Sequence, residues 1–379
     1  MSSNEYKLNL IGGRILMMTP NKGINEEMVN AILAGGWTDV VLLDTPPMRG
    51  SVMAVKRLME EKLRVWYRDH HDLPEEDTRF ASAREIRGYT REICGLLGNR
   101  ARIMTRRDHP SCVGLVKEGE FADPKYLIIA NPDADGLLTA MKAIGLTYNG
   151  MKADADVLDG PASLATQDRL TEYGWLLKTN LALLGGFMGK GIAHLNARKN
   201  EIFENFLKMV QGDQAAHDQL ADNTEKKFGV FAQRMKNLAM QAQMIANGVY
   251  ALDITDAQRQ EPVDIGTLTT YMESLPGCQI TVVVRSNGPL AKHAGGVQYS
   301  LTVASGFQPG FAPSKEDEID LRRAVPENWN VSPESGVISH NAFFLHCAAQ
   351  QWEDVIGPAL LRRFGPVDDV ITDKAGNGE

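Results

Sequence analysis

Acidic residues and histidines gather at three places in the first 160 residues, each directly after a short apolar run. Asp44 ends the first run, an Asp-His-His-Asp segment at 69–72 follows the second, and an Asn-Pro-Asp-Ala-Asp-Gly segment at 131–136 follows the third. In an open α/β sheet, the loops at the carboxyl ends of the strands form the binding crevice. We therefore expect these three segments to surround one cavity.

Carboxylates that lie this close together need a counter-charge, because like charges within a few ångströms repel strongly. Divalent cations would supply it, and a mixture of carboxylate and imidazole ligands suits Mn²⁺, with Mg²⁺, Co²⁺ or Zn²⁺ as competitors. Two ions about 3.5–4 Å apart could share Asp44, activate a water and neutralise a phosphoryl oxygen. The pattern predicts phosphoester hydrolysis at a cavity formed by Asp44, His70, Asp133 and Asp135.

Each segment also has a simpler interpretation. An aspartate at a strand end is often only the N-cap of the next helix, which applies to Asp44, Asp133 and Asp135 alike. Gly136 could only ease a turn, and a short motif such as the one at 69–72 gives false positives. The occurrence of all three segments at strand ends within one α/β unit favours the metal site.

The elements that must position these segments alternate along the chain. Apolar runs predict strands at 39–44, 63–68, 101–105 and 126–130. Helical patterns flank them at 25–34, 51–61, 81–97 and 137–144. This alternation indicates an α/β fold with a parallel sheet covered by helices on both faces. The run at 126–130 is apolar on both faces, so we expect it inside the sheet beside the strand that ends at Asp44.

The rest of the chain divides into two regions. Residues 163–246 are rich in Leu, Ala, Met, Lys, Glu and Gln and contain no proline, which predicts helices. Strands are expected again at 249–254, 279–284 and 297–303, and helices at 265–275 and 348–363. The predicted organisation is a catalytic domain at 1–160, a helical connector at 161–248 and a smaller α/β domain for substrate binding at 249–379.

The three polar segments together resemble a known family. The Asp-His-His triplet at 69–71 resembles the defining triplet of the DHH superfamily of phosphoesterases. The run that ends at Asp44 is similar to the family's strand with a bridging aspartate, and the segment at 131–136 is similar to its Asn-Pro-Asp-x-Asp signature. The resemblance implies that the first domain is a DHH-type catalytic domain.

The resemblance also implies a role for each residue. Four residues would bind metal: Asp44 as a bridge between two ions, His70, Asp133 for one ion and Asp135 for the other. The remaining two would act in catalysis, with His71 facing the phosphate and Asp69 supporting the triplet.

Two features depart from the family pattern. The Asn-Pro-Asp-x-Asp segment normally precedes the triplet and here follows it, which resembles a circular permutation that leaves a site built from strand ends intact. The family also has a metal-binding histidine four residues before the first aspartate of that segment, where this chain has Ile129. Asp108 or His109, which follow the strand at 101–105, or Asp159 could complete the ligand set instead.

The strands after residue 249 resemble, less closely, the substrate-binding domain that accompanies DHH domains. That domain carries a glycine-rich loop with a histidine that grips the nucleotide, and here the segment at 336–342 is similar but lacks two of the glycines. Glycines let backbone N–H groups approach a phosphate, so their loss predicts a changed grip. The resemblance implies His340, Arg285 and Asn341 as substrate-binding residues, while a structural role for the histidine is the simpler alternative.

Composition limits the partners. The net charge is −8, whereas proteins that hold long nucleic acid usually show a basic surface. The expected substrate is therefore a small nucleotide or short oligonucleotide, not long duplex DNA. No apolar run is long enough to cross a bilayer, and residues 1–5 lack the pattern of a signal peptide, which predicts a cytoplasmic protein without a membrane partner. Four dispersed cysteines predict reduced thiols, and a homodimer is compatible with the sequence.

The predicted function is metal-dependent hydrolysis of a short oligonucleotide, a cyclic dinucleotide or a nucleotide monophosphate ester. Two alternatives stay open. The first is a nucleotide-binding or regulatory protein with a decayed site, which Ile129 and the altered glycine loop support, although all six site residues are present. The second is an inorganic polyphosphate or pyrophosphate hydrolase, which shares the metal chemistry. The glycine-rich segment at 185–191 lacks the Ser or Thr of a phosphate loop and is expected only to break a helix.

Overall fold

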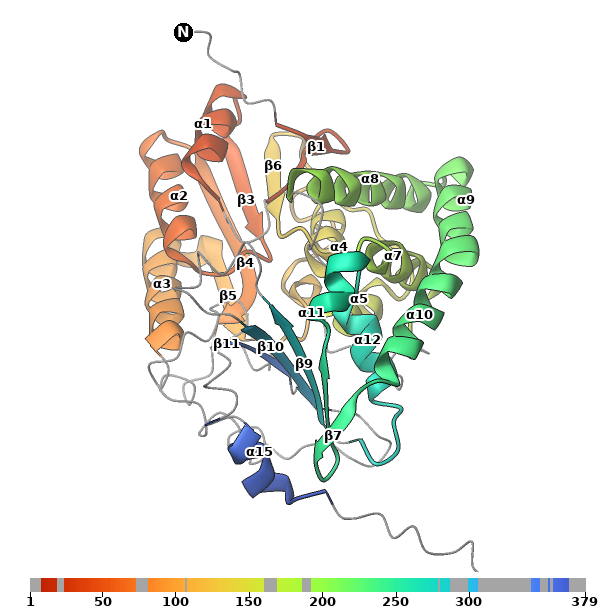
Figure 1. Cartoon of the computed structure of the whole chain (residues 1–379). Coiled ribbons are helices and arrows are strands. Elements are labelled where there is room, and N and C mark those ends of the chain that lie inside the picture. Colours follow the sequence, from red (N-terminus) through yellow and green to blue (C-terminus); the bar gives the residue numbers. More distant parts are fainter. Residues whose placement is uncertain are drawn as a thin grey trace, which may run out of the picture.

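The computed structural model describes residues 8–18, 24–72, 81–105, 108–159, 169–185, 192–278, 280–286, 299–305, 342–347, 354 and 357–367. Within these residues the chain has an α/β fold, the predicted class, with one sheet of six strands and one of five (Figure 1). None of the described helices combines the length and apolar character needed to cross a membrane.

The six-stranded sheet has the order β1-β2-β6-β3-β4-β5. Its four predicted strands are β3 (Asp39–Leu43), β4 (Arg64–Asp72), β5 (Ala101–Thr105) and β6 (Tyr126–Ala130). They pair in parallel, and β2 (Ile15–Met17) joins them in parallel with β6. The short β1 (Leu10–Ile11) is antiparallel to β2. Sequence reasoning missed β1 and β2, which are too short to show an apolar period.

Strand β6 comes last of these strands along the chain but lies between β2 and β3. Its register aligns Ala130 with Leu43, so Asp44 and Asn131 leave the sheet side by side at the same edge. This confirms the prediction that the run at 126–130 is an inner strand next to the one that ends at Asp44.

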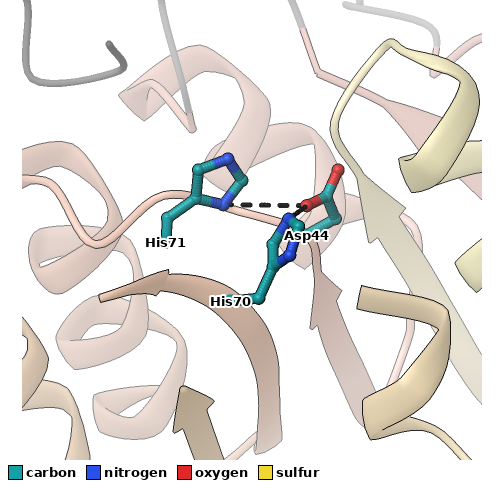
Figure 2. A group of neighbouring side chains, drawn as sticks. All are labelled: Asp44, His70 and His71. Atoms are coloured by element: carbon teal, nitrogen blue, oxygen red, sulfur yellow. Dashed lines mark ion pairs between the residues drawn. The ribbon is translucent and has the colours of Figure 1, made fainter. Parts of the chain in front are cut away.

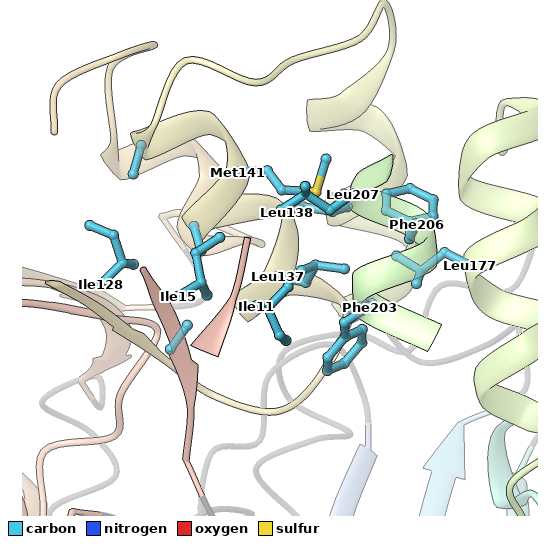
Figure 3. Packing of buried hydrophobic residues seen from close by; sticks show 14 of the residues in the cluster. Ile11, Ile15, Ile128, Leu137, Leu138, Met141, Leu177, Phe203, Phe206 and Leu207 are labelled. Carbon is cyan, nitrogen blue, oxygen red and sulfur yellow. The ribbon is translucent and has the colours of Figure 1, made fainter. Parts of the chain in front are cut away.

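The parallel strands are buried on both faces because their side chains alternate between two cores. On one face, Val40, Leu42, Leu127 and Ile129 pack under α1 (Glu26–Ala34), α2 (Arg49–Glu60) and α3 (Ala81–Leu97). On the other, Val41, Leu43 and Ile128 pack with residues of α4 (Ala134–Ala143), α5 (Met151–Asp159), α7 (Glu172–Ala182), α8 (Ile192–Val210) and α9 (Gln214–Asn223), as Figure 3 shows in part. The helices therefore hold the strand ends rigidly.

Helix α4 begins three residues earlier than predicted. Its N-cap is Asp133, which accepts a hydrogen bond of 2.8 Å from the backbone N–H of Gly136. A Cβ atom on Gly136 would collide with the carbonyl oxygen of Asn131. Glycine is therefore required here so that the helix can start directly under the loop that leaves β6, which is more than the easing of a turn.

Helices and a second sheet follow. Helix α9 continues through a π-helical turn at Thr224–Phe228 into α10 (Gly229–Ala239). The second sheet has the order β11-β10-β9-β8-β7, in which only β8 and β9 pair in parallel. Its strands are β7 (Gln243–Ala246), β8 (Val249–Asp253), β9 (Ile280–Ser286), β10 (Tyr299–Ser305) and β11 (Ala342–Cys347).

Sequence reasoning missed β7 and β11. Strand β7 therefore starts the second sheet before residue 249, the predicted start of the third domain. Helices α11 (Thr255–Gln260), α12 (Ile265–Met272) and α15 (Gly357–Phe364) complete this part of the described chain. Cys94, Cys112 and Cys278 are free thiols, as expected.

Candidate metal centre

Asp44 follows β3 directly and is fully buried. Its φ of 51° lies in the left-handed region, which is uncommon for a residue other than glycine and which aspartate tolerates better than most. Its backbone N–H donates a hydrogen bond of 2.9 Å to the Arg68 carbonyl of β4, which fixes this turn. The N-cap of α2 is Met48, so helix capping does not account for Asp44.

Two buried hydroxyl groups donate hydrogen bonds to backbone carbonyls of the loop after Asp44. Tyr67 donates a hydrogen bond of 2.6 Å to the Thr45 carbonyl, and Ser51 donates one of 2.9 Å to the Pro46 carbonyl. Burial raises the pKa of Tyr67 well above its usual range, so the phenol stays a donor. These two bonds keep the carboxylate of Asp44 in one place at the sheet edge.

Strand β4 brings two neighbouring histidines to Asp44. His70 Nε2 lies 3.1 Å and His71 Nδ1 lies 3.7 Å from Asp44 Oδ1 (Figure 2). Neighbouring side chains of a regular strand point to opposite faces, but the pairing of β4 with β5 shifts register between Asp69 and Asp72. This irregularity lets both imidazoles reach the same carboxylate.

Hydrogen bonding assigns the proton of His70. Its Nδ1 lies 2.9 Å from the backbone carbonyl oxygen of His109, which can only accept, so a neutral ring carries its proton on Nδ1. The lone pair of Nε2 then faces three carboxylates: Asp44 at 3.1 Å, Asp135 at 3.5 Å and Asp159 at 3.7 Å. In this neutral tautomer the carboxylates would repel the lone pair, and a cation between them would remove the repulsion. A backbone carbonyl behind the ring is the usual support of a metal-binding histidine.

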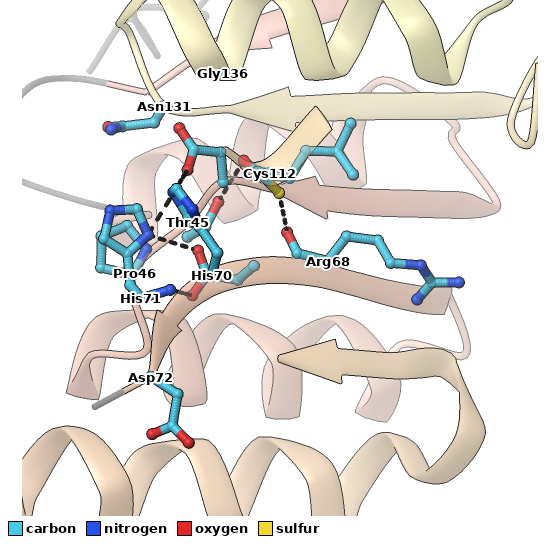
Figure 4. Close-up of polar contacts among 12 residues, drawn as sticks. Thr45, Pro46, Arg68, His70, His71, Asp72, Cys112, Asn131 and Gly136 are labelled. Atoms are coloured by element: carbon cyan, nitrogen blue, oxygen red, sulfur yellow. Dashed lines mark hydrogen bonds and ion pairs between the residues drawn. The ribbon is translucent and has the colours of Figure 1, made fainter. Parts of the chain in front are cut away.

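Asp69 contacts the second histidine through both of its carboxylate oxygens. Its Oδ1 lies 2.8 Å from His71 Nδ1, and its Oδ2 accepts a hydrogen bond of 2.8 Å from the His71 backbone N–H. The two contacts fix the plane of the His71 ring. Asp72 lies apart from this group in Figure 4 and accepts a hydrogen bond of 3.1 Å from Thr90 of α3.

Asp135 enters the site from the first turn of α4. Its Oδ2 accepts a hydrogen bond of 2.7 Å from the backbone N–H of Cys112, and its Oδ1 accepts one of 3.2 Å from Thr139. Burial raises the pKa of Asp135 well above its ordinary value, and the charge of Asp44 adds to this, whereas His70 opposes it. The ionised carboxylate therefore lacks enough positive charge around it.

Asp133 lies at the same edge of the sheet and interacts with both Asp44 and Asp159. Its pKa is also raised, by burial and then by the neighbouring Asp159, while a hydrogen bond with Asp44 and the charge of Lys199 on α8 lower it. The amide of Asn131 donates a hydrogen bond to Asp133. The capping interpretation is thus correct for Asp133, but it explains only one of its two oxygens.

Two sets of side chains in the described chain bring potential ligand atoms within 4.8 Å of one another: Asp44 with His70 and His71, and His70 with Asp135 and Asp159. Both share His70. Carboxylate oxygens with an imidazole nitrogen suit Mn²⁺ and its neighbours in hardness. The buried residues therefore fit one or two divalent cations.

Asp108 and His109, two of the residues considered for the missing ligand, fall outside these sets. Asp108 is exposed and accepts a hydrogen bond from Thr105 at 2.8 Å. His109 contributes its carbonyl to His70, while its own ring is not in either set. Burial and the nearby Arg102 lower the pKa of His109. Asp159, the third residue considered for the ligand set, lies at the end of α5 and belongs to the second set, with its Oδ2 3.7 Å from His70 Nε2.

The substrate-binding predictions fall in the second part of the chain. Arg285 lies in β9, and its side chain is outside the described atoms. His340 and Asn341 are outside the described residues, just before β11. Their roles stay predictions.

Sequence reasoning missed three contributors. The carbonyl of His109 and the N–H of Cys112 act through the backbone, which no residue pattern can show. Lys199 lies far along the chain, in a helix with several charged residues, and its Nζ donates a hydrogen bond of 2.8 Å to the Pro132 carbonyl. No local signal separates it from Lys208, the other lysine of α8.

The chain has similarity to solved structures but matches no protein family. No protein-family model matches the chain, and no curated protein matches it. Chains of solved structures do match, among them a pGpG-specific phosphodiesterase, PggH from Vibrio cholerae, at 12% sequence identity. The match covers 86% of this chain and 98% of that chain at a TM-score of 0.36. A similarity at this level does not establish a common fold or activity.

Proposed function

We propose that this chain is a Mn²⁺-dependent hydrolase of a small nucleotide-type phosphoester and a member of the DHH superfamily. One observation carries the proposal: the buried Nε2 of His70 faces the carboxylates of Asp44, Asp135 and Asp159 within 3.1–3.7 Å. The three-segment motif pattern supports the family, and the acidic composition supports a small substrate.

A bound divalent cation would supply Lewis-acid polarisation of a phosphoryl oxygen and a water made acidic enough to attack at neutral pH. Asp44, His70, Asp133, Asp135 and Asp159 would hold it. The chain's own residues do the rest of the work: the His109 carbonyl orients His70, and Asp69 orients His71 toward the phosphate. With Nδ1 held by Asp69, a protonated His71 has Nε2–H to donate to an anionic substrate.

The buried Tyr67 and the helices around the sheet keep these groups in place before substrate arrives. Pre-organised groups of this kind stabilise developing charge at no further cost in reorganisation. A decayed regulatory site would be expected to lose at least one of its buried acids, because four carboxylates without a cation destabilise the fold. The complete set favours the enzyme.

The test is hydrolysis by metal-stripped protein to which Mn²⁺ is returned, with a linear dinucleotide, a cyclic dinucleotide, a nucleotide 3′-monophosphate and pyrophosphate as substrates. We expect Mn²⁺-dependent turnover of one of the nucleotide esters. His70→Ala and Asp135→Asn should abolish it, whereas Asp123→Asn, which changes an exposed acid paired with Lys125, should not. Turnover of pyrophosphate alone would select the inorganic hydrolase, and tight Mn²⁺ binding without any turnover would select the decayed site.

A further inference from the structure

A lysine of helix α8 contacts the loop that follows β6 and carries Asp133. Lys199 Nζ donates a hydrogen bond of 2.8 Å to the carbonyl of Pro132, which lies between Asn131 and Asp133. The helix is anchored by Phe203 and Phe206, both fully buried in the core beside β6 and α4 (Figure 3). The position of the ammonium group is therefore fixed by packing along the rest of the helix.

The environment of Lys199 differs from that of Lys208, the other lysine of α8. Lys208, two and a half turns later, lies on the surface and pairs with Glu204 at 3.5 Å. Lys199 instead lies close enough to Asp133 for its charge to lower the pKa of that carboxyl. An ammonium has three N–H donors, and the carbonyl of Pro132 accepts only one of them.

A second polar group lies on the same face one turn earlier. The side-chain Oδ1 of Asn196 is buried and accepts no hydrogen bond from the described residues. Residues three apart on a helix are neighbours, so Asn196 and Lys199 form a polar strip on a helix that otherwise buries aromatic and aliphatic side chains. A strip of this kind is costly to bury unless it has a ligand to bind.

We propose that Lys199 is a substrate-binding residue of the metal site and donates to a non-bridging oxygen of the substrate phosphoryl group. This inference rests on the proposed hydrolase function and extends its site from the sheet to the connecting helices. A lysine ammonium is a compact charge that suits phosphate recognition. The carbonyl of Pro132 holds it at the loop that carries Asp133, so that phosphate meets cation and ammonium together.

The competing explanation is that Lys199 only ties α8 to the loop. The two roles separate because a tie needs an N–H donor, whereas phosphate binding needs the charge. Lys199→Gln keeps a donor and loses the charge, Lys199→Arg keeps the charge, and Lys208→Gln is the same change at an exposed position of the same helix.

The experiment is isothermal titration calorimetry in two steps, first with Mn²⁺ and then, on the Mn²⁺-loaded protein, with phenyl phosphate as a phosphomonoester that has no base. We expect all four proteins to bind Mn²⁺ within about threefold of one another. The Kd for phenyl phosphate should rise about tenfold or more in Lys199→Gln, because a charge-assisted hydrogen bond is lost. It should change by less than about threefold in Lys199→Arg and not at all in Lys208→Gln.

A lower melting temperature in Lys199→Gln with unchanged affinity for phenyl phosphate would overturn the inference. Lys199 would then only connect α8 to the loop after β6. Wild-type protein that binds Mn²⁺ but no phenyl phosphate would overturn it as well, without touching the metal site. Wild-type protein that binds no Mn²⁺ would overturn the proposed function together with the inference.

Discussion

Two aspartates at the carboxyl ends of strands have different surroundings in this chain. Asp44 directly follows β3 of the first sheet, and Asp253 is the last residue of β8 of the second. Asp253 is exposed, and its Oδ1 accepts a hydrogen bond of 2.8 Å from the N–H of Thr255, two residues on, at the start of α11. Asp44 is buried, has a left-handed backbone and faces two histidines of another strand.

The difference lies in the neighbours and not in the residue. Beside β3, the strands β4 and β6 end at the same edge of a parallel sheet and add their own polar residues. Beside β8, the only parallel neighbour is β9, since β7 is antiparallel. An acid at a strand end therefore indicates a site only when several parallel strands bring polar residues to the same edge.

The largest expected effect separates the two regions by activity. Asp133→Asn keeps the size of the side chain and its ability to cap α4 but removes one charge from the metal site. We expect kcat to fall by about 10³-fold or more in Mn²⁺-dependent hydrolysis of a dinucleotide. Asp253→Asn, the matched change in the second sheet, should stay within twofold, and circular dichroism should show both variants folded.

The next effect is on stability with and without metal. At a Mn²⁺ concentration of 100 times Kd, the wild-type protein should gain about 2.7 kcal/mol in free energy of unfolding. Asp44→Asn should lose this gain, because the proposed metal site loses one carboxylate, and asparagine tolerates the left-handed backbone at this position. In EDTA the same variant should be more stable than wild type by about 1 kcal/mol, since one of several repelling carboxylates is removed.

Asp253→Asn should show neither change. Both free energies come from urea unfolding at pH 7. If Asp44→Asn still gains free energy of unfolding when Mn²⁺ is added, Asp44 is not a ligand of the metal.

A smaller effect is expected from the predicted substrate-binding residue. His340→Ala should raise KM about tenfold with little change in kcat, the signature of binding that is equal in ground and transition states. Steady-state kinetics with Mn²⁺ check this. A fall in kcat at unchanged KM would instead place His340 at the reacting phosphate.

The smallest effect concerns the support under Asp44. Tyr67→Phe removes the hydrogen bond to the Thr45 carbonyl and leaves a buried acceptor without its donor. We expect a loss of about 1–3 kcal/mol in free energy of unfolding, and a fall in Mn²⁺ affinity because Asp44 is less firmly placed. Unchanged Mn²⁺ affinity would show that the hydrogen bonds of the Arg68 and Pro46 carbonyls position this turn without Tyr67.

The first sheet could be predicted from the sequence because its signals are local. Apart from Asp39, the runs that form β3 and β6 consist of aliphatic and aromatic residues, as strands buried on both faces require. Their shared edge then follows from the topology of parallel sheets, which is why Asp44, His70 and Asp135 could be expected to meet. The second sheet is mostly antiparallel, and the positions of β7 and β11 depend on partners distant in sequence.

The supports of the site could not be predicted in the same way. The His109 carbonyl and the Cys112 N–H act through the backbone. Asp159 reaches His70, and Lys199 reaches the Pro132 carbonyl, only because of how α5 and α8 pack. From the sequence, Gly136 could be interpreted only as a turn residue. The close approach of the Asn131 carbonyl, which leaves no room for a Cβ atom at this position, is visible only in the structure.

The central claim is that His70 and the surrounding carboxylates bind a divalent cation. The most direct measurement is an anomalous difference map at the manganese absorption edge from crystals of the protein grown with Mn²⁺. We expect a peak about 2.2 Å from His70 Nε2 and from carboxylate oxygens of Asp44 and Asp135. A map without a peak at His70, in protein that crystallised with saturating Mn²⁺, would contradict the account.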